Sequence, residues 1–260
     1  MDRIFLPSHH REGDQFHVNG STRRHLADSL RVRVGERFLA TDGDGHEFLL
    51  EATTVTKSEL VADLVELREQ PAAKVGVTLA IAPPKGSRME TALEKATEVG
   101  VQRIVPLKAD HAVVKSRDGS SKTDRWGRVL QSATAQSGRL FVPELTPSVS
   151  AHRFVEGELG LHLLAHLSED AVPIEEALAA IESPVAIHVM IGPEGGFSAR
   201  EVDRAGRAGA TLVSLGPNRL RTETAAIVAA TLAVRTTFRW EEAWPAASSA
   251  TSSKERSPES

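Results

Sequence analysis

Hydrophobic and polar positions alternate in two different ways along this chain, and the change falls near residue 72. In the first seventy residues the apolar runs are short, as in Phe38–Thr41 and Glu47–Leu50, which flank the turn Asp42-Gly43-Asp44-Gly45. Two such runs around an Asp-Gly turn predict a β-hairpin, and Leu60–Leu67 predicts a further strand. A short helix is expected over residues 21–31, capped by its first residue. On this pattern alone the segment is a small β-domain with no activity of its own.

From residue 73 onward, solid apolar runs alternate with segments of helical period. Strands are predicted over residues 77–82, 104–107, 159–165, 185–191 and 212–215, and helices over 88–99, 124–137, 173–181, 199–208 and 223–238. Continuous apolar strands separated by helices indicate a parallel sheet that is covered on both faces. The predicted domains are therefore residues 1–72 and 73–244. Residues 245–260, rich in Ser, Ala and Pro, are expected to form a disordered tail.

Composition narrows the chemistry more than it narrows the fold. The 260 residues are 40% hydrophobic and 25% charged, which is ordinary for a globular protein, and they include no cysteine. Disulfides, thiolate metal sites and a cysteine nucleophile are thereby excluded. The ten histidines show no pair with a persuasive metal-ligand spacing, so no metal is expected.

Neither a membrane span nor a signal peptide is expected. No apolar stretch reaches the length of a membrane helix, and the charged N-terminus lacks an apolar block. We therefore expect a cytoplasmic protein with no membrane partner. The formal net charge is −4, yet residues 81–140 hold 11 basic and 6 acidic side chains. A basic segment in a near-neutral chain is a weak indication of a polyanionic partner.

A glycine-rich loop follows the predicted strand 185–191. Gly192-Pro193-Glu194-Gly195-Gly196 precedes Ser198-Ala199-Arg200-Glu201, which has the spacing of a helix capping box. Open α/β sheets bind ligands where a strand's carboxyl end meets a helix N-terminus, and glycines let the backbone approach a ligand closely. The loop has neither the Walker nor the dinucleotide spacing. Its alternative interpretation is a tight strand-to-helix turn.

A second loop, Leu215–Ala225, also joins a strand to a helix and carries two arginines, one glutamate and two threonines. The alternative is a solvated loop in which Thr222 caps the helix and Glu223 favours its dipole. Two such loops at the ends of successive strands favour a shared pocket. The segments 83–90 and 131–139 hold cations at helix ends, and each alone is more typical of structure than of function.

These four segments, in this order, resemble the RsmE family of 16S rRNA uridine-N3 methyltransferases, in the SPOUT superfamily. The matching segments are Leu93–Leu107, Ala135–Pro143, Ile191–Ser198 and Ser214–Ala225, and residues 25–45 resemble the family's N-terminal domain. The resemblance implies a PUA-like β-barrel followed by a SPOUT-type α/β domain with a C-terminal trefoil knot. It also implies a homodimer, S-adenosylmethionine as methyl donor, and N3 of a uridine in 16S rRNA of the small ribosomal subunit as acceptor.

The resemblance also suggests roles for single residues. Arg221 is expected to stabilise charge on the uracil oxygens, and Glu223 or Glu194 to accept the N3 proton. The expected cofactor contacts are Leu164, His166, Ile191, Gly192, Pro193, Gly195, Leu215, Gly216, Leu220, Thr224 and Ala225. The expected RNA contacts are His25, Arg31, Lys85, Arg88, Lys95 and Arg139, the last reaching the active site of the partner subunit.

Two other functions stay open at this point. One is an RNA-binding ribosome-assembly protein that keeps the fold without catalysis, and S-adenosylmethionine binding would argue against it. The other is an oxidoreductase that binds a nucleotide cofactor on the same sheet, although the dinucleotide fingerprint is missing.

Overall fold

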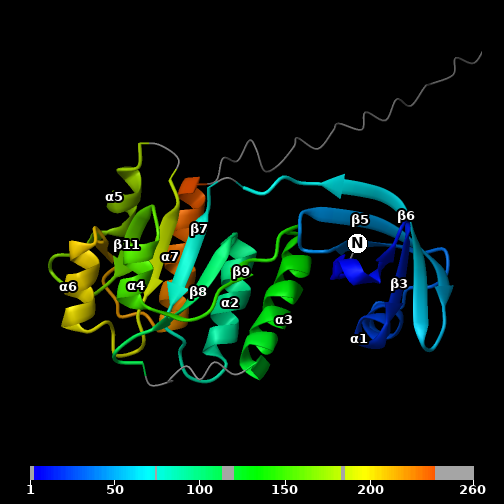
Figure 1. Cartoon of the computed structure of the whole chain (residues 1–260), viewed down its shortest axis with the longest axis horizontal. Helices are drawn as coiled ribbons and strands as arrows, with labels where there is room; N and C mark the ends of the chain where they lie inside the picture. Colours follow the sequence, from blue (N-terminus) through cyan, green and yellow to red (C-terminus); the bar gives the residue numbers. More distant parts are fainter. Residues whose placement is uncertain (1–2, 74, 113–119, 183–184, 238–260) are drawn as a thin grey trace, which may run out of the picture.

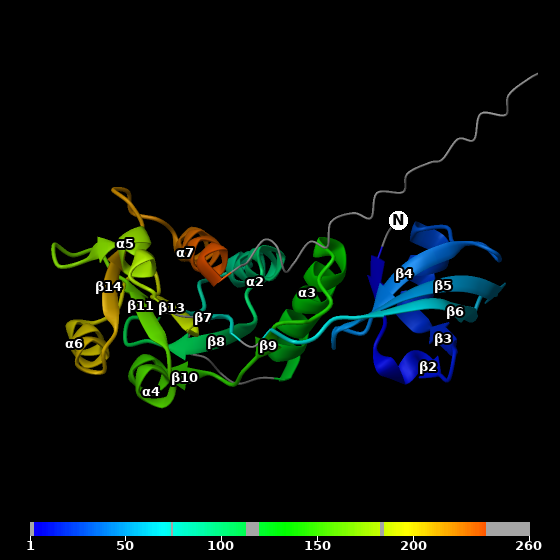
Figure 2. The same ribbon diagram turned by 90° about the horizontal axis from the view of Figure 1, so that it is seen from above.

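The chain forms two β-sheets at the two ends of an elongated molecule, with helix α3 (Ser120–Ser137) between them (Figures 1 and 2). This computed structural model describes residues 3–73, 75–112, 120–182 and 185–237. The predicted tail, residues 245–260, lies outside the described residues, as do residues 238–244. None of the helices in the described ranges combines the length and apolar character that crossing a bilayer requires.

The N-terminal sheet has six strands. In spatial order they are β1 (Arg3–Phe5), β4 (Arg37–Thr41), β5 (His46–Val55), β6 (Glu59–Glu69), β3 (Gln15–Asn19) and β2 (Arg11–Glu12). The predicted hairpin is confirmed, since β4 and β5 pair antiparallel around the Asp-Gly turn. Alternate residues point inward, so Phe16, Phe48 and Leu50 form part of a separate apolar core.

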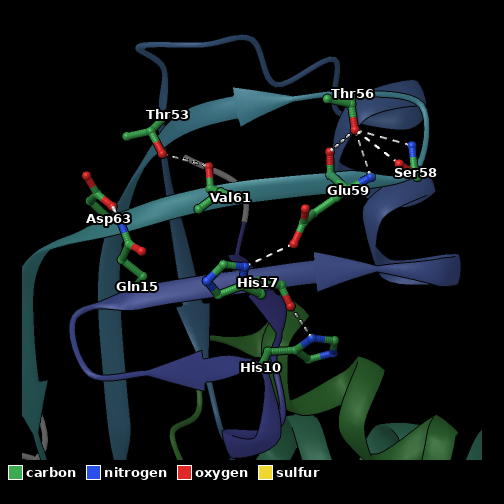
Figure 3. A network of polar contacts seen from close by, with 9 residues as sticks. All are labelled: His10, Gln15, His17, Thr53, Thr56, Ser58, Glu59, Val61 and Asp63. Atoms are coloured by element: carbon green, nitrogen blue, oxygen red, sulfur yellow. Dashed lines mark hydrogen bonds and ion pairs between the residues drawn. The ribbon is translucent and has the colours of Figure 1, made fainter.

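The outer surface of this sheet carries cross-strand polar pairs (Figure 3). His17 Nδ1 on β3 lies 3.0 Å from Glu59 Oε1 on β6, and Gln15 Nε2 donates to Asp63 Oδ1 at 2.9 Å. Gln15 and Asp63 are directly opposed, whereas His17 is opposite Val61 and reaches Glu59 diagonally; both kinds of cross-strand pair stabilise the sheet.

The predicted helix over residues 21–31 is wrong in its extent. Helix α1 (Gly20–Arg24) runs into a π-helical turn, η2 (His25–Ser29), and its N-cap is Asn19 without a side-chain cap. Arg31 ends the segment with a φ of +58°, a left-handed conformation that no α-helix continues through. Leu26 is fully buried, and tertiary packing rather than capping therefore fixes this segment.

The second sheet is parallel, as predicted. Its spatial order is β10 (Val149–Ser150), β8 (Arg103–Lys108), β7 (Val77–Ile81), β13 (Ile187–Ile191), β11 (Leu161–Ala165), β14 (Thr211–Ser214) and β12 (Val172–Pro173), and β9 (Glu144–Leu145) pairs with β8. Every residue of β7 and β13 is buried. Both faces of the sheet are therefore covered.

Helices lie on the two faces of this sheet (Figure 2). One apolar cluster joins the sheet to α2 (Arg88–Val99), α3, α5 (Ile174–Ala179) and α7 (Thr222–Thr237), and the other joins it to α4 (Ala151–Gly157) and α6 (Ala199–Arg207). Gly100 closes α2 with a φ of +111°, as its position after the helical repeat predicts. The two-residue strands and α4 were not predicted.

The turn between β4 and β5 contacts the segment that follows α3, and so joins the N-terminal unit (the first sheet) to the second unit (the parallel sheet and its helices). Val142 N donates to Gly43 O and Gly45 N donates to Leu140 O, both at 2.9 Å. A Cβ on Gly45 would lie 2.7 Å from the ring of Phe141, so the close approach needs glycine. Arg3 on β1 pairs with Glu47 and lies against Gly138 at the end of α3.

Candidate functional site

The carboxyl ends of β11, β13 and β14 surround one cavity of about 430 Å³. Its wall comes from residues 165–167, 191–197 and 218–222, together with Val213, Leu215, Gly216 and Ala225. Because the strands are parallel, the loops that follow them meet at the same edge of the sheet. The two glycine-containing loops singled out in the sequence do share a pocket.

Most residues expected to contact a cofactor line this cavity. They are His166, Ile191, Gly192, Pro193, Gly195, Leu215, Gly216, Leu220 and Ala225. Leu164 and Thr224 are not brought to the wall. Leu164 is fully buried and packs with the α4 and α6 cluster, because strand alternation turns its side chain away from Ala165.

Several lining residues were missed by sequence reasoning. They are Ala165, Leu167, Gly196, Phe197, Val213, Asn218, Arg219 and Thr222. Gly196, Phe197, Asn218, Arg219 and Thr222 lie in the two marked segments, so counting each whole segment would have found them; Ala165, Leu167 and Val213 lie outside those segments. Leu167 is 56% exposed and lies in the wall of the cavity.

Backbone shape explains the glycines of this wall. Gly196 and Gly216 have φ values of +72° and +117°, and a Cβ on Gly192 would lie 3.2 Å from the Phe197 ring and main-chain nitrogen. Thr222 Oγ1 donates to Gly192 O at 3.2 Å and so ties the two loops together. The result is an apolar cleft lined by exposed peptide groups, which is typical of a site for a small organic ligand.

Hydrogen bonds and an ion pair to Asp110, which follows β8, hold the end of the glycine-rich loop 192–196. The predicted capping box at Ser198 and Glu201 is confirmed. Ser198 Oγ also donates to Asp110 Oδ2 at 2.6 Å, and Arg200 Nη2 lies 3.1 Å from the same oxygen. These contacts, the Ser198 hydrogen bond first, lower the pKa of the Asp110 carboxyl. Asp110 gave no sequence signal, since it follows β8 and is 88 residues from Ser198.

Two of the three residues proposed for catalysis line the cavity, and the third lies next to it. Arg221 and Glu194 line the cavity, whereas Glu223 lies beside it in the first turn of α7. Arg88, expected to contact RNA, instead lies between the two carboxylates. Its Nη1 is 3.4 Å from Glu194 Oε1 and its Nε is 3.8 Å from Glu223 Oε1. Lys85 N donates to Glu194 Oε1 at 3.4 Å.

The residues expected to contact RNA do not form one patch. His25 and Arg31 are exposed on the segment that ends at Arg31, and Lys85 is exposed on the distant loop before α2. Lys95 pairs with Glu94 and Glu98 at 2.7 and 2.8 Å, and these hydrogen bonds raise the pKa of its ammonium.

Arg139 has partners that fit a structural role within its own subunit. Its Nη1 donates to the carbonyls of Thr97 and Val101, both at 2.7 Å. Thr97 lies in the last turn of α2 and Val101 follows its C-cap Gly100, so Arg139 ties the segment after α3 to the end of α2. Burial lowers the pKa of Arg139 to about 10.

The buried histidines form no metal site. His162 and His188 stack on neighbouring strands with ring centroids 4.7 Å apart. Within the described residues, no group of three or more His, Asp or Glu side chains is arranged to hold a metal ion.

Two family profiles match this chain. One is described as an RNA methyltransferase domain and matches residues 71–234, and the other is described as an RNA methyltransferase PUA domain and matches residues 18–65.

Curated relatives match over most of the chain. Ribosomal RNA small subunit methyltransferase E of Bacillus subtilis (strain 168) is 29% identical over 233 residues, which cover 84% of this chain and 89% of that protein. The protein of the same name from Mycobacterium tuberculosis is 32% identical over 235 residues, covering 86% and 87%.

Solved structures give the same picture. The enzyme of that name from Neisseria gonorrhoeae, bound to S-adenosyl methionine, superposes with a TM-score of 0.77 at 29% identity and covers 88% of this chain and 95% of that chain. A methyltransferase from Legionella pneumophila, in complex with the cofactor SAM, gives a TM-score of 0.78 at 30% identity and covers 89% and 96%.

Proposed function

This chain belongs to the RNA methyltransferase family, among the ribosomal RNA small subunit methyltransferases E, and we propose that it transfers a methyl group from S-adenosylmethionine to N3 of a uridine in 16S rRNA. The observation that carries this proposal is the cavity at the ends of β11, β13 and β14. Its apolar wall and glycine backbone suit an adenosine, and its rim carries the arginine and glutamate that proton removal from an imide requires.

The bound donor supplies an activated methyl group, and the protein supplies position and charge. The main chain of Gly192, Gly195 and Gly216 contacts the nucleoside and the amino-acid chain. Leu215 and Leu220 would hold the nucleoside, and His166 closes one side of the cleft. These assignments follow the cavity wall, and Leu164 and Thr224 are left out because they do not reach it.

N3 methylation needs no thiol, in keeping with a chain that has no cysteine. The N3 proton passes to Glu223, or to Glu194, as the N3 lone pair forms its bond to the methyl carbon. The carbon–sulfur bond breaks and its electrons remain on sulfur. Arg221 stabilises the negative charge that develops on the uracil oxygens.

RNA is bound mainly by the N-terminal unit and the cleft beside it. A cavity of about 770 Å³ lies between that unit and α3, beside the contact of β1 with α3. It is lined by Arg3, His25 and Arg128, by hydroxyl and amide side chains, and by the apolar Ile4, Phe5, Leu30 and Leu39. Among the described residues that line it, none is Asp or Glu. With few aromatic residues for stacking, we assign the affinity to phosphate and shape contacts.

The assembly is a homodimer that uses α7. This helix has no charged residue between Glu223 and Arg235, and Ile227, Val228 and Leu232 on it are only partly buried in the single chain. A helix with an uncharged middle part and partly buried apolar side chains fits an interface between two copies.

The finer fold is a PUA-like barrel over residues 1–72 and a trefoil knot within 73–244. The first sheet ends at Glu69 and the second begins at Val77, in support of this boundary. The knot is supported by the path of the chain, because α7 follows β14 but packs on β7, β13 and α2, with Thr222 bonded to Gly192.

The test uses small ribosomal subunits from cells that lack the gene. Incubation with the purified protein and S-adenosylmethionine should add one methyl group per 16S rRNA, and mass spectrometry of nucleosides should identify it as 3-methyluridine. Absence of both donor binding and methyl transfer would instead support an assembly protein, and binding of a nicotinamide dinucleotide would support an oxidoreductase. Methylation at any other atom would contradict the assigned acceptor.

A further inference from the structure

Three segments that are distant in the sequence converge on one guanidinium. Arg88 starts α2, Glu194 belongs to the loop after β13, and Glu223 lies in the first turn of α7. Arg88 approaches one carboxylate through Nη1 and the other through Nε, at 3.4 and 3.8 Å. Among the described residues, Arg88 is the one cation within 4 Å of either carboxylate.

The carboxylate of Glu223 depends on this contact. Its side chain is 14% exposed, and its Oε2 is buried without a hydrogen-bond partner in the described part of the chain. A buried carboxylate is costly unless an opposite charge or hydrogen bonds compensate it. The N-terminal end of α7 contributes a favourable dipole, and Arg88 contributes the full charge.

The other charged groups around α7 are less well placed than Arg88 to compensate the carboxylate of Glu223. The helices packed against it carry Glu90, Glu94, Lys95 and Glu98 on α2, and Glu175 and Glu176 on α5; its preceding residue is Arg221. Lys95 is already paired with Glu94 and Glu98. The titratable His188 on β13 lies near the amino end of that strand, away from the cavity at its carboxyl end.

We propose that Arg88 is a positioning residue, which contacts the carboxylates of Glu194 and Glu223 through different nitrogens and so holds Glu223 in place to accept a proton. This inference rests on the proposed function, because the proton is the one that uridine N3 releases. It also gives Arg88 a task other than the phosphate contact expected from the sequence. The planar guanidinium meets two carboxylates through different nitrogens, which a single ammonium does less well.

The chain offers a matched control. Arg125 Nε lies 3.2 Å from Glu90 Oε1, and Glu90 Oε2 is also buried without a partner among the described residues. Like the Arg88–Glu223 pair, this pair joins an arginine to a glutamate with one buried oxygen that lacks a partner, but it links α3 to α2 and, unlike Arg88, does not contact Glu194 in the cavity wall.

The experiment compares Arg88→Gln, Arg88→Lys and Arg125→Gln in the full-length protein. In single-turnover methylation of small subunits, Arg88→Gln should lower the rate about tenfold to a hundredfold, as expected for a misplaced catalytic group. S-adenosylmethionine affinity, measured by calorimetry, should change less than about twofold. Arg88→Lys should recover part of the rate, and Arg125→Gln should behave like the wild type.

A double variant tests whether Arg88 acts through Glu223. Arg88→Gln combined with Glu223→Gln should be no slower than Glu223→Gln alone, because two groups that act as a unit are not additive. Additive losses, a parallel loss of cofactor affinity, or an equal loss in Arg125→Gln would overturn the proposal.

A measurement without catalysis separates this inference from the proposed function. The Nε–H signal of Arg88 in a nitrogen–proton correlation spectrum should shift in Glu223→Gln and in Glu194→Gln, and should stay in place in Glu90→Gln. If the wild type transfers no methyl group, the proposed function fails and this spectrum alone decides whether Arg88 holds the carboxylates. An unmoved signal would refute the positioning role even in an active enzyme.

Discussion

Arg139 and Arg221 differ in what holds their guanidinium groups. Arg139 is half-buried and donates to two carbonyls at the end of α2, and loss of hydration lowers its pKa to about 10. Arg221 is exposed at the cavity wall, and no hydrogen bond or ion pair restrains its side chain among the described residues. The first arginine therefore stabilises the chain, and the second is available to a ligand.

We predict that Arg221→Lys loses most methyl transfer but keeps S-adenosylmethionine binding. Lysine retains the charge but not the fork of donors, and loss of one preorganised donor typically lowers the rate about a hundredfold or more. Single-turnover kinetics measures the rate of methyl transfer, and calorimetry on the same samples measures the affinity for S-adenosylmethionine. Arg207→Lys, an exposed change in the last turn of α6, serves as the control. A near-normal rate, or a parallel loss of rate and cofactor affinity, would rule out the catalytic role.

At the scale of elements, the start of α6 shows how one helix end can fix a binding loop. Ser198 accepts from Glu201 N at 3.2 Å within the capping box and donates to Asp110 at 2.6 Å. Asp110 N in turn donates to Glu201 Oε1 at 3.0 Å. The loop that ends at Ser198 is thus held from the helix on one side and from the segment after β8 on the other.

Ser198→Ala should therefore lower the free energy of unfolding by about 1–2 kcal/mol and weaken S-adenosylmethionine binding. Ser150 is the N-cap of α4 but makes no side-chain capping bond, so Ser150→Ala should cost less than about 0.5 kcal/mol. Urea unfolding gives both values. Equal losses in the two variants would show that the contacts of Ser198 contribute little.

The stacked histidines on β11 and β13 should make the stability of the parallel sheet depend on pH. His162 and His188 are 4% and 2% exposed and lie opposite each other in register. Burial lowers the pKa of His188 below its ordinary 6.5, and His162 and Arg103 act in the same direction. The carbonyl of Leu159 and the carboxylate of Glu158 oppose that shift but do not cancel it.

Stability should consequently fall as the pH drops below about 6.5, because the unfolded chain binds a proton that the folded protein resists. Urea midpoints at about pH 7.5 and about pH 5.5 measure the effect. His188→Gln can keep the hydrogen bond to Leu159 O through its amide and should reduce the pH dependence, whereas the exposed His25→Gln should leave it unchanged. An undiminished dependence in His188→Gln would place the responsible group elsewhere.

At the scale of the whole molecule, one turn sets how the two units meet. The bridge between Asp44 and Phe141 and the backbone bonds from Gly45 and Val142 join the N-terminal sheet to the segment that follows α3. Gly45 has a φ of +102°, and an added Cβ would lie 2.7 Å from both Gln70 O and Phe141 Cζ.

Gly45→Ala should loosen this docking and lower methylation of small subunits while S-adenosylmethionine affinity stays the same. Gly13→Ala is the matched control, since Gly13 also has a positive φ, +64°, but open space around its Cα. Both variants carry backbone strain of about 1 kcal/mol, and the clash should add about 1–3 kcal/mol for Gly45 alone. Unfolding by urea and protease cleavage between the sheets measure the difference. If both variants cleave and methylate alike, the turn does not set the arrangement.

The elements that the sequence by itself determined are those whose signal is local. The helical repeat of α2, the buried runs of β7 and β13 and the capping box of α6 each depend on neighbours within a few residues, and each is where the pattern predicts it. The two glycine loops are also predicted from local sequence, because each consists of a buried strand, then glycine, then the start of a helix. Strands of two residues, such as β9 and β12, exist only because a longer strand lies beside them.

Tertiary structure alone decided which side chains meet. Arg88 contacts Glu194 across 106 positions, Ser198 contacts Asp110 across 88, and Arg139 reaches the end of α2 across 42 and 38. No local pattern encodes such pairs, since each depends on the spatial order of the parallel strands and on which face a helix occupies. The sequence by itself therefore predicts where the cavity lies, whereas only the tertiary structure brings Arg88 to Glu194 and Glu223, and Arg139 to the end of α2.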